Sequence, residues 1–269
     1  MSSLRPIGVF DSGIGGLTVA RAIHDLLPEE SILYFGDTAH LPYGEKSPEL
    51  IQRYSTRIAR HLVKSGCKAI VVACNSASSN ALQAIISEVG PNIPVIDMVT
   101  PVVKYVTQNC AQACQVGLIG TRATIASGLY HLCFKELSSS VELISKATPL
   151  LASAIEEGFF NDSISQAVLD AYFSDETFHN IDSLILGCTH YPLIKSEVKN
   201  FLPSRVSVID SPSIVAEALK SVLAEMDEKL HASRQMKQHH FQVSDLTKNF
   251  KFSARHFFGD DLILEEVVL

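Results

Sequence analysis

The chain has 269 residues, of which 46% are hydrophobic and 19% charged, so it can bury a full core, which argues against global disorder. The formal net charge of −7 argues against a nucleic-acid partner, because phosphate binding needs a basic surface. No apolar run approaches the roughly 18 residues that suggest a membrane span, and the N-terminus lacks the apolar segment of a signal peptide, so we expect a cytoplasmic protein with no membrane contact.

Short apolar runs alternate with helical stretches along the first hundred residues. The runs are "IGVF" (7–10), "ILYFGD" (32–37), "AIVVAC" (69–74) and "PVID" (94–97). Between the second and third, apolar residues recur at helical spacing, with Ser47 as N-cap, Pro48 at the first helical position and Gly66 at the end. Strands that are apolar throughout predict a mostly parallel sheet covered by helices on both faces.

The same pattern then repeats in the second half of the chain. "VGLIGTRATIASGLYHL" (116–132) resembles the first strand, glycine turn and helix, and Cys188 lies 188 − 74 = 114 residues after Cys74. Any α/β protein is self-similar at one strand–helix period, but four matching positions occur here in the same order. We therefore predict two pseudo-symmetric, doubly wound α/β domains with mostly parallel sheets. Their predicted extents are residues 1–98 plus 208–269 for the first and 99–207 for the second.

In open α/β sheets, ligands bind beyond the carboxyl ends of the strands, so two facing halves predict an active-site cleft between the domains. Six cysteines do not resemble a disulfide framework, and we expect Cys110, Cys114 and Cys133 to be structural, most cysteines acting as small core residues. Cys74 and Cys188 differ, because each stands directly at a strand end and begins a turn into a helix. A helix N-terminus stabilises a thiolate. One such cysteine is as readily structural as functional, but a matched pair in two related halves favours function.

Two facing thiols predict stereoinversion at a carbon atom. One group removes a proton from one face, and the other returns a proton to the opposite face. The cysteine and histidine spacings do not suggest a metal site, and no dinucleotide, phosphate-loop or pyridoxal phosphate signature is present, so we expect no metal and no cofactor.

Further polar residues follow other strand ends. Asp11 and Ser12 end the first strand and precede a glycine turn into a helix, where a carboxylate can bind. His190 is a candidate proton partner for the nearby thiol, and Asp11 is its counterpart in the first half. Tyr43 and Gly44 can bind a small ligand, or can form an ordinary turn.

Four motifs together resemble the glutamate racemases of the aspartate/glutamate racemase superfamily, in family order and over nearly the whole chain. They are "FDSGIGGL" (10–17), "YFGDTAHLPYGEKS" (34–47), "ACNSAS" (73–78) and "GCTHYP" (187–192). The resemblance implies a cofactor-independent enzyme that interconverts L- and D-glutamate and supplies D-glutamate for peptidoglycan. The catalytic residues that it implies are Cys74, Cys188, Asp11, His190 and Glu156. Glu157 is the alternative to Glu156.

The resemblance also implies a set of substrate contacts. These are Asp11, Ser12, Tyr43, Gly44, Asn75, Ser76, Thr121 and Thr189. Ser76 stands where the family usually has threonine, so the hydroxyl is kept and the packing is expected to be looser. A homodimer is expected from the frequency of dimers among soluble enzymes.

Three alternatives remain open. An aspartate racemase of the same superfamily would use the same thiols with a shorter side-chain pocket. A cysteine hydrolase would use Cys188 with His190 through a covalent intermediate, which leaves Cys74 unexplained. An anion or amino-acid binding module would bind its ligand without proton exchange at Cα.

Overall fold

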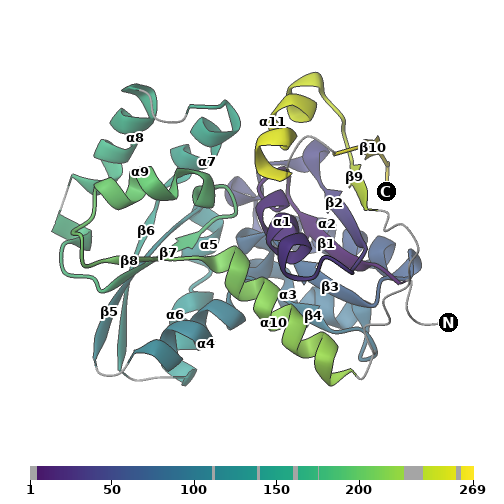
Figure 1. Ribbon diagram of the computed structural model, residues 1–269, viewed down its shortest axis with the longest axis horizontal. Coiled ribbons are helices and arrows are strands. Elements are labelled where there is room, and N and C mark those ends of the chain that lie inside the picture. Colours follow the sequence, from purple (N-terminus) through teal and green to yellow (C-terminus); the bar gives the residue numbers. More distant parts are fainter. Residues whose placement is uncertain are drawn as a thin grey trace.

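A computed structural model describes residues 5–110, 113–137, 140–159, 163–174, 176–226, 239–258 and 262–269, apart from the side chains of residues 249, 252 and 256. It contains two parallel sheets that lie side by side (Figure 1). Among the described residues, none of the helices has the length and apolar character that a membrane crossing requires.

The first sheet has the strand order β10-β9-β2-β1-β3-β4, and every pairing in it is parallel. Its strands are β1 (Ile7–Asp11), β2 (Ile32–Gly36), β3 (Ala69–Val72), β4 (Val95–Ile96), β9 (His240–Val243) and β10 (Leu264–Glu266). Every residue of the three central strands is buried, because helices cover both faces.

The second sheet has the strand order β6-β5-β7-β8 and is also parallel throughout. Its strands are β5 (Cys114–Gly120), β6 (Val141–Ala147), β7 (Ser183–Gly187) and β8 (Ser207–Ile209). This order matches β2-β1-β3-β4 of the first sheet, strand for strand. The predicted α/β class with two related halves is therefore confirmed.

Helices connect the strands and cover the sheets. The α-helices are α1 (Leu17–Leu26), α2 (Pro48–Lys64), α3 (Asn75–Val89), α4 (Thr100–Asn109), α5 (Arg122–Ala126), α6 (Leu129–Leu137), α7 (Pro149–Glu156), α8 (Ser163–Phe173), α9 (Lys195–Asn200), α10 (Ser211–Glu225) and α11 (Lys248–Phe258). Short 3-10 turns are η1 (Thr38–His40), η2 (Tyr43–Glu45), η3 (Glu176–Phe178) and η4 (Tyr191–Ile194). The predicted helix after Ser47 is confirmed, since Ser47 Oγ accepts a hydrogen bond from Leu50 N and Gly66 ends it with a φ of +78°.

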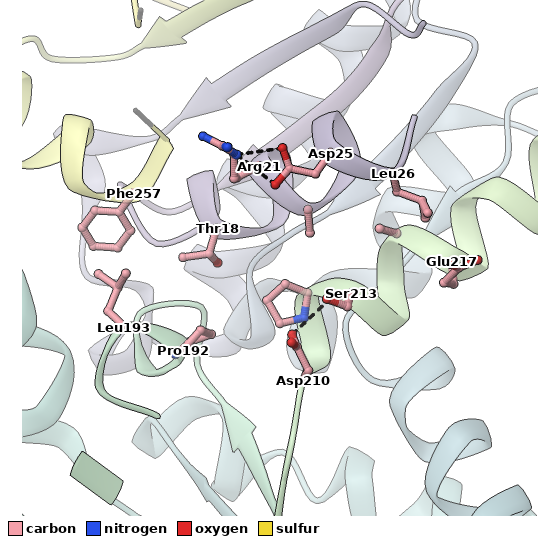
Figure 2. Close-up of a pocket in the computed structure, with 13 residues that line it drawn as sticks. Thr18, Arg21, Asp25, Leu26, Pro192, Leu193, Asp210, Ser213, Glu217 and Phe257 are labelled. Carbon is pink, nitrogen blue, oxygen red and sulfur yellow. Dashed lines mark hydrogen bonds and ion pairs between the residues drawn. The ribbon is translucent and has the colours of Figure 1, made fainter. Parts of the chain in front are cut away.

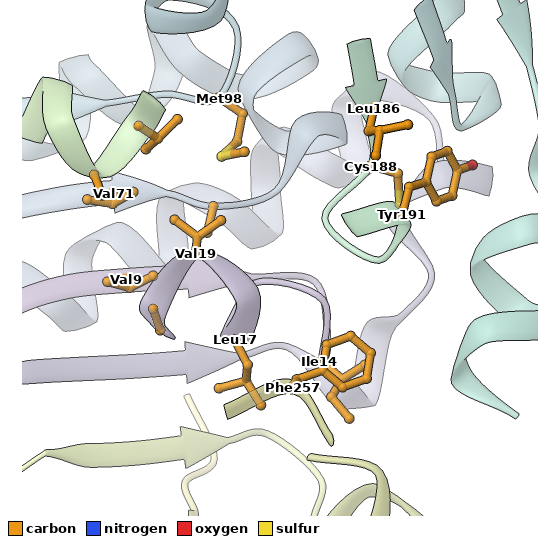
Figure 3. Packing of buried hydrophobic residues seen from close by; sticks show 14 of the residues in the cluster. Val9, Ile14, Leu17, Val19, Val71, Met98, Leu186, Cys188, Tyr191 and Phe257 are labelled. Carbon is orange, nitrogen blue, oxygen red and sulfur yellow. The ribbon is translucent and has the colours of Figure 1, made fainter. Parts of the chain in front are cut away.

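One of the buried apolar clusters spans both halves. The largest buried cluster joins residues of β1 and α1 to residues of β7, η4 and α7 to α9. Figure 3 shows Cys188 and Tyr191 beside Leu186, and Phe257 of α11 next to Ile14. Helix α10 packs on both α1 and α4 and lies between the two sheets (Figure 1).

The last strands return to the first sheet, where β9 pairs with β2. Strand β8, at 207–209, pairs with β7 of the second sheet. We propose that each sheet is the core of one domain, and the boundaries at 98/99 and 207/208 stay a prediction.

The prediction that most cysteines are small core residues is wrong for Cys110 and Cys114. Cys110 and Cys114 form a disulfide between the end of α4 and the start of β5, and neither is a buried core residue. Their Cα atoms are 6.2 Å apart, within the range that a disulfide spans. Cys133 is half-buried, whereas Cys67, Cys74 and Cys188 are buried free thiols.

Candidate active site

A small cavity lies where strand ends of both sheets meet. Its lining is Ser12, Leu41, Pro42, Tyr43, Gly44, Cys74, Asn75, Ser76, Thr121, Ala152, Ser153, Glu156, Cys188, Thr189 and His190. Ser12 follows β1, Cys74 follows β3, Thr121 follows β5 and Cys188 follows β7. The lining thus contains every residue predicted for the site except Asp11. The cavity is small, with a volume of about 30 Å³.

Cys74 is the N-cap of α3 and is 4% exposed. Its sulfur accepts a hydrogen bond from Ala77 N at 3.4 Å and lies 3.7 Å from Ser12 Oγ. Burial raises the pKa of the Cys74 thiol, and the negative charge of Asp11 raises it further. Cys74 is therefore held as a neutral thiol, the form that can donate a proton.

Asp11 ends β1 and is fully buried behind the cavity lining. Its Oδ2 accepts hydrogen bonds from Gly13 N at 3.2 Å and Gly16 N at 2.9 Å. Burial raises the pKa of the Asp11 carboxyl, while the charge of His190 and the backbone donors oppose this shift. Gly16 is required here, because a Cβ atom at that position would overlap Asp11. The glycine turn thus fixes a carboxylate that interacts electrostatically with both Cys74 and His190.

A chain of side-chain contacts lies on the other side of the cavity and joins Cys188, His190 and Glu156. His190 Nδ1 lies 3.5 Å from Cys188 Sγ, and His190 Nε2 lies 2.8 Å from Glu156 Oε1. Glu156 ends α7, whereas Glu157 is exposed at the helix cap, so the structure brings Glu156 and not Glu157 to the histidine. Burial disfavours the imidazolium, but negative charge and hydrogen bonding from Cys188 and Glu156 outweigh it and raise the pKa of His190 well above its usual value.

This raised pKa gives a stability prediction. Since the pKa of His190 is higher in the folded protein, the fold holds a proton that the unfolded chain releases above about pH 6.5. The contribution of His190 to the free energy of unfolding should be complete below that pH and should decline as the pH rises, by up to about 1.4 kcal/mol per pH unit. A Cys188 thiolate would release one proton on folding for the one that His190 holds, so the slope is measured by denaturant unfolding from pH 6 to 9 in a Cys188→Ser background. Adding His190→Asn should remove the decline, and adding His179→Asn, an exposed histidine, should keep it; equal slopes with and without His190→Asn contradict the assignment.

Tyr43 and Gly44 belong to the turn η2, which reaches toward the second half. The Tyr43 hydroxyl donates to Asp37 Oδ2 at 2.6 Å, and Ser244 Oγ donates to Asp37 Oδ1 at 2.9 Å. Asp37 therefore holds the turn against the first sheet. Gly44 packs directly on Thr121, since a Cβ atom at Gly44 would lie 2.6 Å from Thr121 Cβ.

Gly44→Ala is expected to prevent this close approach of the halves and to reduce turnover about tenfold or more, because misplacing reacting groups by about 1 Å is enough to cost a large part of the rate. Glu45→Ala is the matched control at the adjacent, exposed position. It removes only the surface ion pair with Arg122, so turnover should change less than about twofold. Steady-state kinetics of both variants test this, and equal losses would refute the packing argument.

Hydroxyl and amide groups join the halves around the thiols. Ser76 Oγ lies 2.9 Å from Thr121 Oγ1, and Thr121 in turn caps α5 through Thr124 N at 3.2 Å. On the Cys188 side, Thr18 Oγ1 donates to Thr189 O at 3.1 Å. The serine at position 76 thus keeps a hydroxyl contact across the cavity.

Sequence reasoning missed several residues that support the site. Thr18, Thr124 and Tyr130 contact lining residues, and Ser153 is itself in the lining. Thr124 stands three residues after the cap residue Thr121, but the capping-box pattern has Glu or Gln at that position, so the sequence does not single it out. Tyr130 lies in an ordinary apolar helix pattern and offers no signal of its own.

A larger hollow of about 570 Å³ lies between α1, η4, α10 and α11 (Figure 2). Arg21 and Asp25 pair with each other on one wall, and Phe257 faces Leu193 on another. The lining of this hollow contains no thiol. The smaller cavity, lined by Cys74 and Cys188, is therefore the better candidate for proton chemistry. Within the described part of the chain, no group of three or more His, Cys, Asp or Glu side chains is arranged to hold a metal ion.

Comparisons with known proteins find similarity over most or all of the chain. The sequence model of the Asp/Glu/hydantoin racemase family matches residues 14–219. The chain is 38% identical to a glutamate racemase of Chlorobaculum tepidum over 268 residues, covering 100% of this chain and 97% of the relative. A glutamate racemase of Aquifex aeolicus is 44% identical over 214 residues, covering 80% of this chain and 82% of the relative.

Solved structures give the same result. The crystal structure of a glutamate racemase from Francisella tularensis in complex with D-glutamate matches with a TM-score of 0.89 and 38% identity, covering 98% of both chains. A glutamate racemase isoform from Bacillus anthracis matches with a TM-score of 0.91 and 33% identity, covering 99% of this chain and 98% of that one. An aspartate racemase of Picrophilus torridus, 16% identical with a TM-score of 0.60, shares the fold alone. The resemblance seen in the four sequence motifs is confirmed.

Proposed function

Because the chain belongs to the Asp/Glu/hydantoin racemase family, we propose that it interconverts L- and D-glutamate without a cofactor, using Cys74 and Cys188 as the two acid/base groups. One observation carries the proposal: the two thiols stand at matching strand ends of the two halves and line one shared cavity. The full-length similarity to glutamate racemases, one of them solved with D-glutamate, supports the choice of substrate.

The reaction begins with proton removal. The thiolate of Cys188 takes the α-proton of the enantiomer whose Cα–H bond faces it, and the bonding electrons stay on the substrate as a carbanion delocalised into the α-carboxylate. Cys74 then donates its thiol proton to the opposite face of the carbon. The product is the other enantiomer, with a thiol at Cys188 and a thiolate at Cys74, and the reverse direction runs through the same groups.

The neighbours of the two thiols favour opposite protonation states at the start of the reaction. On one side, burial and the Asp11 charge raise the pKa of Cys74 and keep its proton in place. On the other, the His190 imidazolium stabilises negative charge on the sulfur 3.5 Å away, and Glu156 holds the imidazolium. A pair with one proton donor and one charged base is what inversion at carbon needs.

The carbanion needs hydrogen-bond donors, since no electron sink is proposed. We assign this role to Ser12, Asn75, Ser76, Thr121 and Thr189, with Tyr43 and Gly44 closing the cavity. Fixed donors around a dry site stabilise developing charge more strongly than water does. The cavity is small, with a volume of about 30 Å³, and we propose that the halves separate to admit the substrate and close again around it.

The alternatives make different predictions. An aspartate racemase would turn over aspartate faster than glutamate, a cysteine hydrolase would trap an acyl group on Cys188, and a binding module would exchange no Cα proton. The test is incubation of the protein with each enantiomer of glutamate and aspartate in heavy water, without added cofactor. We expect inverted glutamate deuterated at Cα, with aspartate much slower; glutamate that binds without deuteration would refute the proposal.

The wider roles follow from the activity. D-Glutamate made by this reaction would supply peptidoglycan synthesis, in the cytoplasm where we expect the protein to act. A homodimer stays a prediction, which sedimentation of the purified protein tests.

A further inference from the structure

Asn75, a residue of the cavity lining, accepts a hydrogen bond from a tyrosine of the other half. Tyr130 lies on α6 and is 1% exposed, and Asn75 begins α3 and is 2% exposed. The Tyr130 hydroxyl donates to Asn75 Oδ1 at 2.9 Å. Tyr130 itself is not part of the lining, so it acts on the cavity only through Asn75.

The other end of the same amide has no partner. Asn75 Nδ2 is buried and forms no hydrogen bond with any residue that the structure describes. A buried donor without an acceptor is destabilising, unless a ligand supplies the acceptor. The carboxylates of an amino-acid substrate are such acceptors, and an amide nitrogen offers them two N–H groups.

The orientation of the amide decides whether Asn75 attracts or repels a carboxylate. With Oδ1 bound by Tyr130, the NH₂ group is the end left for the ligand. A flipped amide would turn Oδ1, an acceptor, toward the substrate oxygens. Burial, and next to it the charge of Asp97, raise the pKa of the Tyr130 phenol, so Tyr130 stays a proton donor and favours the first orientation.

We propose that Tyr130 is a positioning residue that fixes the Asn75 amide with its NH₂ group toward a substrate carboxylate. The inference rests on the proposed function, because it takes an amino acid as the ligand. Since Tyr130 and Asn75 belong to different halves, their bond forms only when the halves are together. Closure of the cleft therefore also sets the direction of this donor.

The test is a double-mutant cycle of Tyr130→Phe and Asn75→Ala on the full chain, with racemisation of glutamate as the readout. Tyr130→Phe keeps the ring and removes only the donor. Alone it should raise KM about tenfold, the loss of one oriented hydrogen bond to a charged group, with a smaller change in kcat. In the Asn75→Ala background it should change kcat/KM less than about twofold, because nothing remains to orient.

Tyr105→Phe, on the exposed side of α4, is the matched control and should leave both parameters unchanged. Unfolding midpoints of all variants separate loss of folding from loss of binding. An equal effect of Tyr130→Phe in both backgrounds assigns it a merely structural role and overturns the proposal, as does an unchanged KM.

The two proposals can fail separately. If the wild-type protein exchanges no Cα proton of glutamate, the proposed function fails. The same cycle measured on the dissociation constant of D-glutamate still decides the positioning role: non-additive losses support it, and additive losses overturn it.

Discussion

Serine in place of Cys74 or Cys188 is expected to abolish racemisation of glutamate, with turnover reduced by about 10²- to 10⁴-fold, the contribution of a general acid or base. A serine hydroxyl matches the size of the thiol and keeps a hydrogen-bonding group. It holds its proton far more tightly, so it can neither serve as the base nor be regenerated as the acid in the reverse direction. Steady-state racemisation from both enantiomers measures the loss.

The two variants should differ in heavy water. Cys74→Ser retains the base Cys188, so the enantiomer whose proton faces Cys188 should exchange that proton without inverting. Cys188→Ser should show the opposite preference. Cys133→Ser, a half-buried thiol outside the cavity lining, is the control and should behave as wild type. Near-normal turnover in either cavity variant would end the two-thiol mechanism.

Glu156→Gln is expected to reduce kcat/KM by about tenfold to 100-fold and to shift the alkaline limb of its pH profile to lower pH. Glutamine keeps an oxygen for the bond to His190 Nε2 but removes the charge. Without that charge the pKa of His190 falls, and the imidazolium beside Cys188 is lost at a lower pH. The pH dependence of kcat/KM is the measurement.

Glu157→Gln is the matched control, because it makes the same chemical change at the next, exposed position. It should leave the profile unchanged. The two enantiomers have equal free energies, so kcat/KM must fall by the same factor in both directions, which checks the data internally. A Glu156→Gln profile identical to wild type would mean that the ion pair with His190 has no part in turnover.

The sequence predicts much of the fold because its local signals agree with the tertiary structure. The cap at Ser47, the glycine stop at Gly66 and the buried central strands are where the pattern puts them. The cysteines at the two strand ends stand out for the same reason. A strand end is marked by an abrupt change from apolar to small polar residues, and that change is local.

Features that depend on helix phase or on the other half were not predictable in this way. Whether Glu156 or Glu157 faces the cavity depends on where α7 ends, which sequence reasoning fixes only to within a few residues. The burial of Asp11 behind the lining, and the contact of Tyr130 with Asn75, arise from packing between segments far apart in the chain. The Cys110–Cys114 disulfide depends on how closely the end of α4 approaches the start of β5, which a spacing of four residues does not specify.

The closed cavity has a consequence for the timing of proton exchange. Cys74 is 4% and Cys188 6% exposed, so in the proposed reaction the sulfur that has just received a substrate proton has little contact with solvent until the halves part. Under the proposed mechanism each turnover moves one proton between Cys74 and Cys188, and the free enzyme accepts the same enantiomer again only after exchange with solvent has returned that proton.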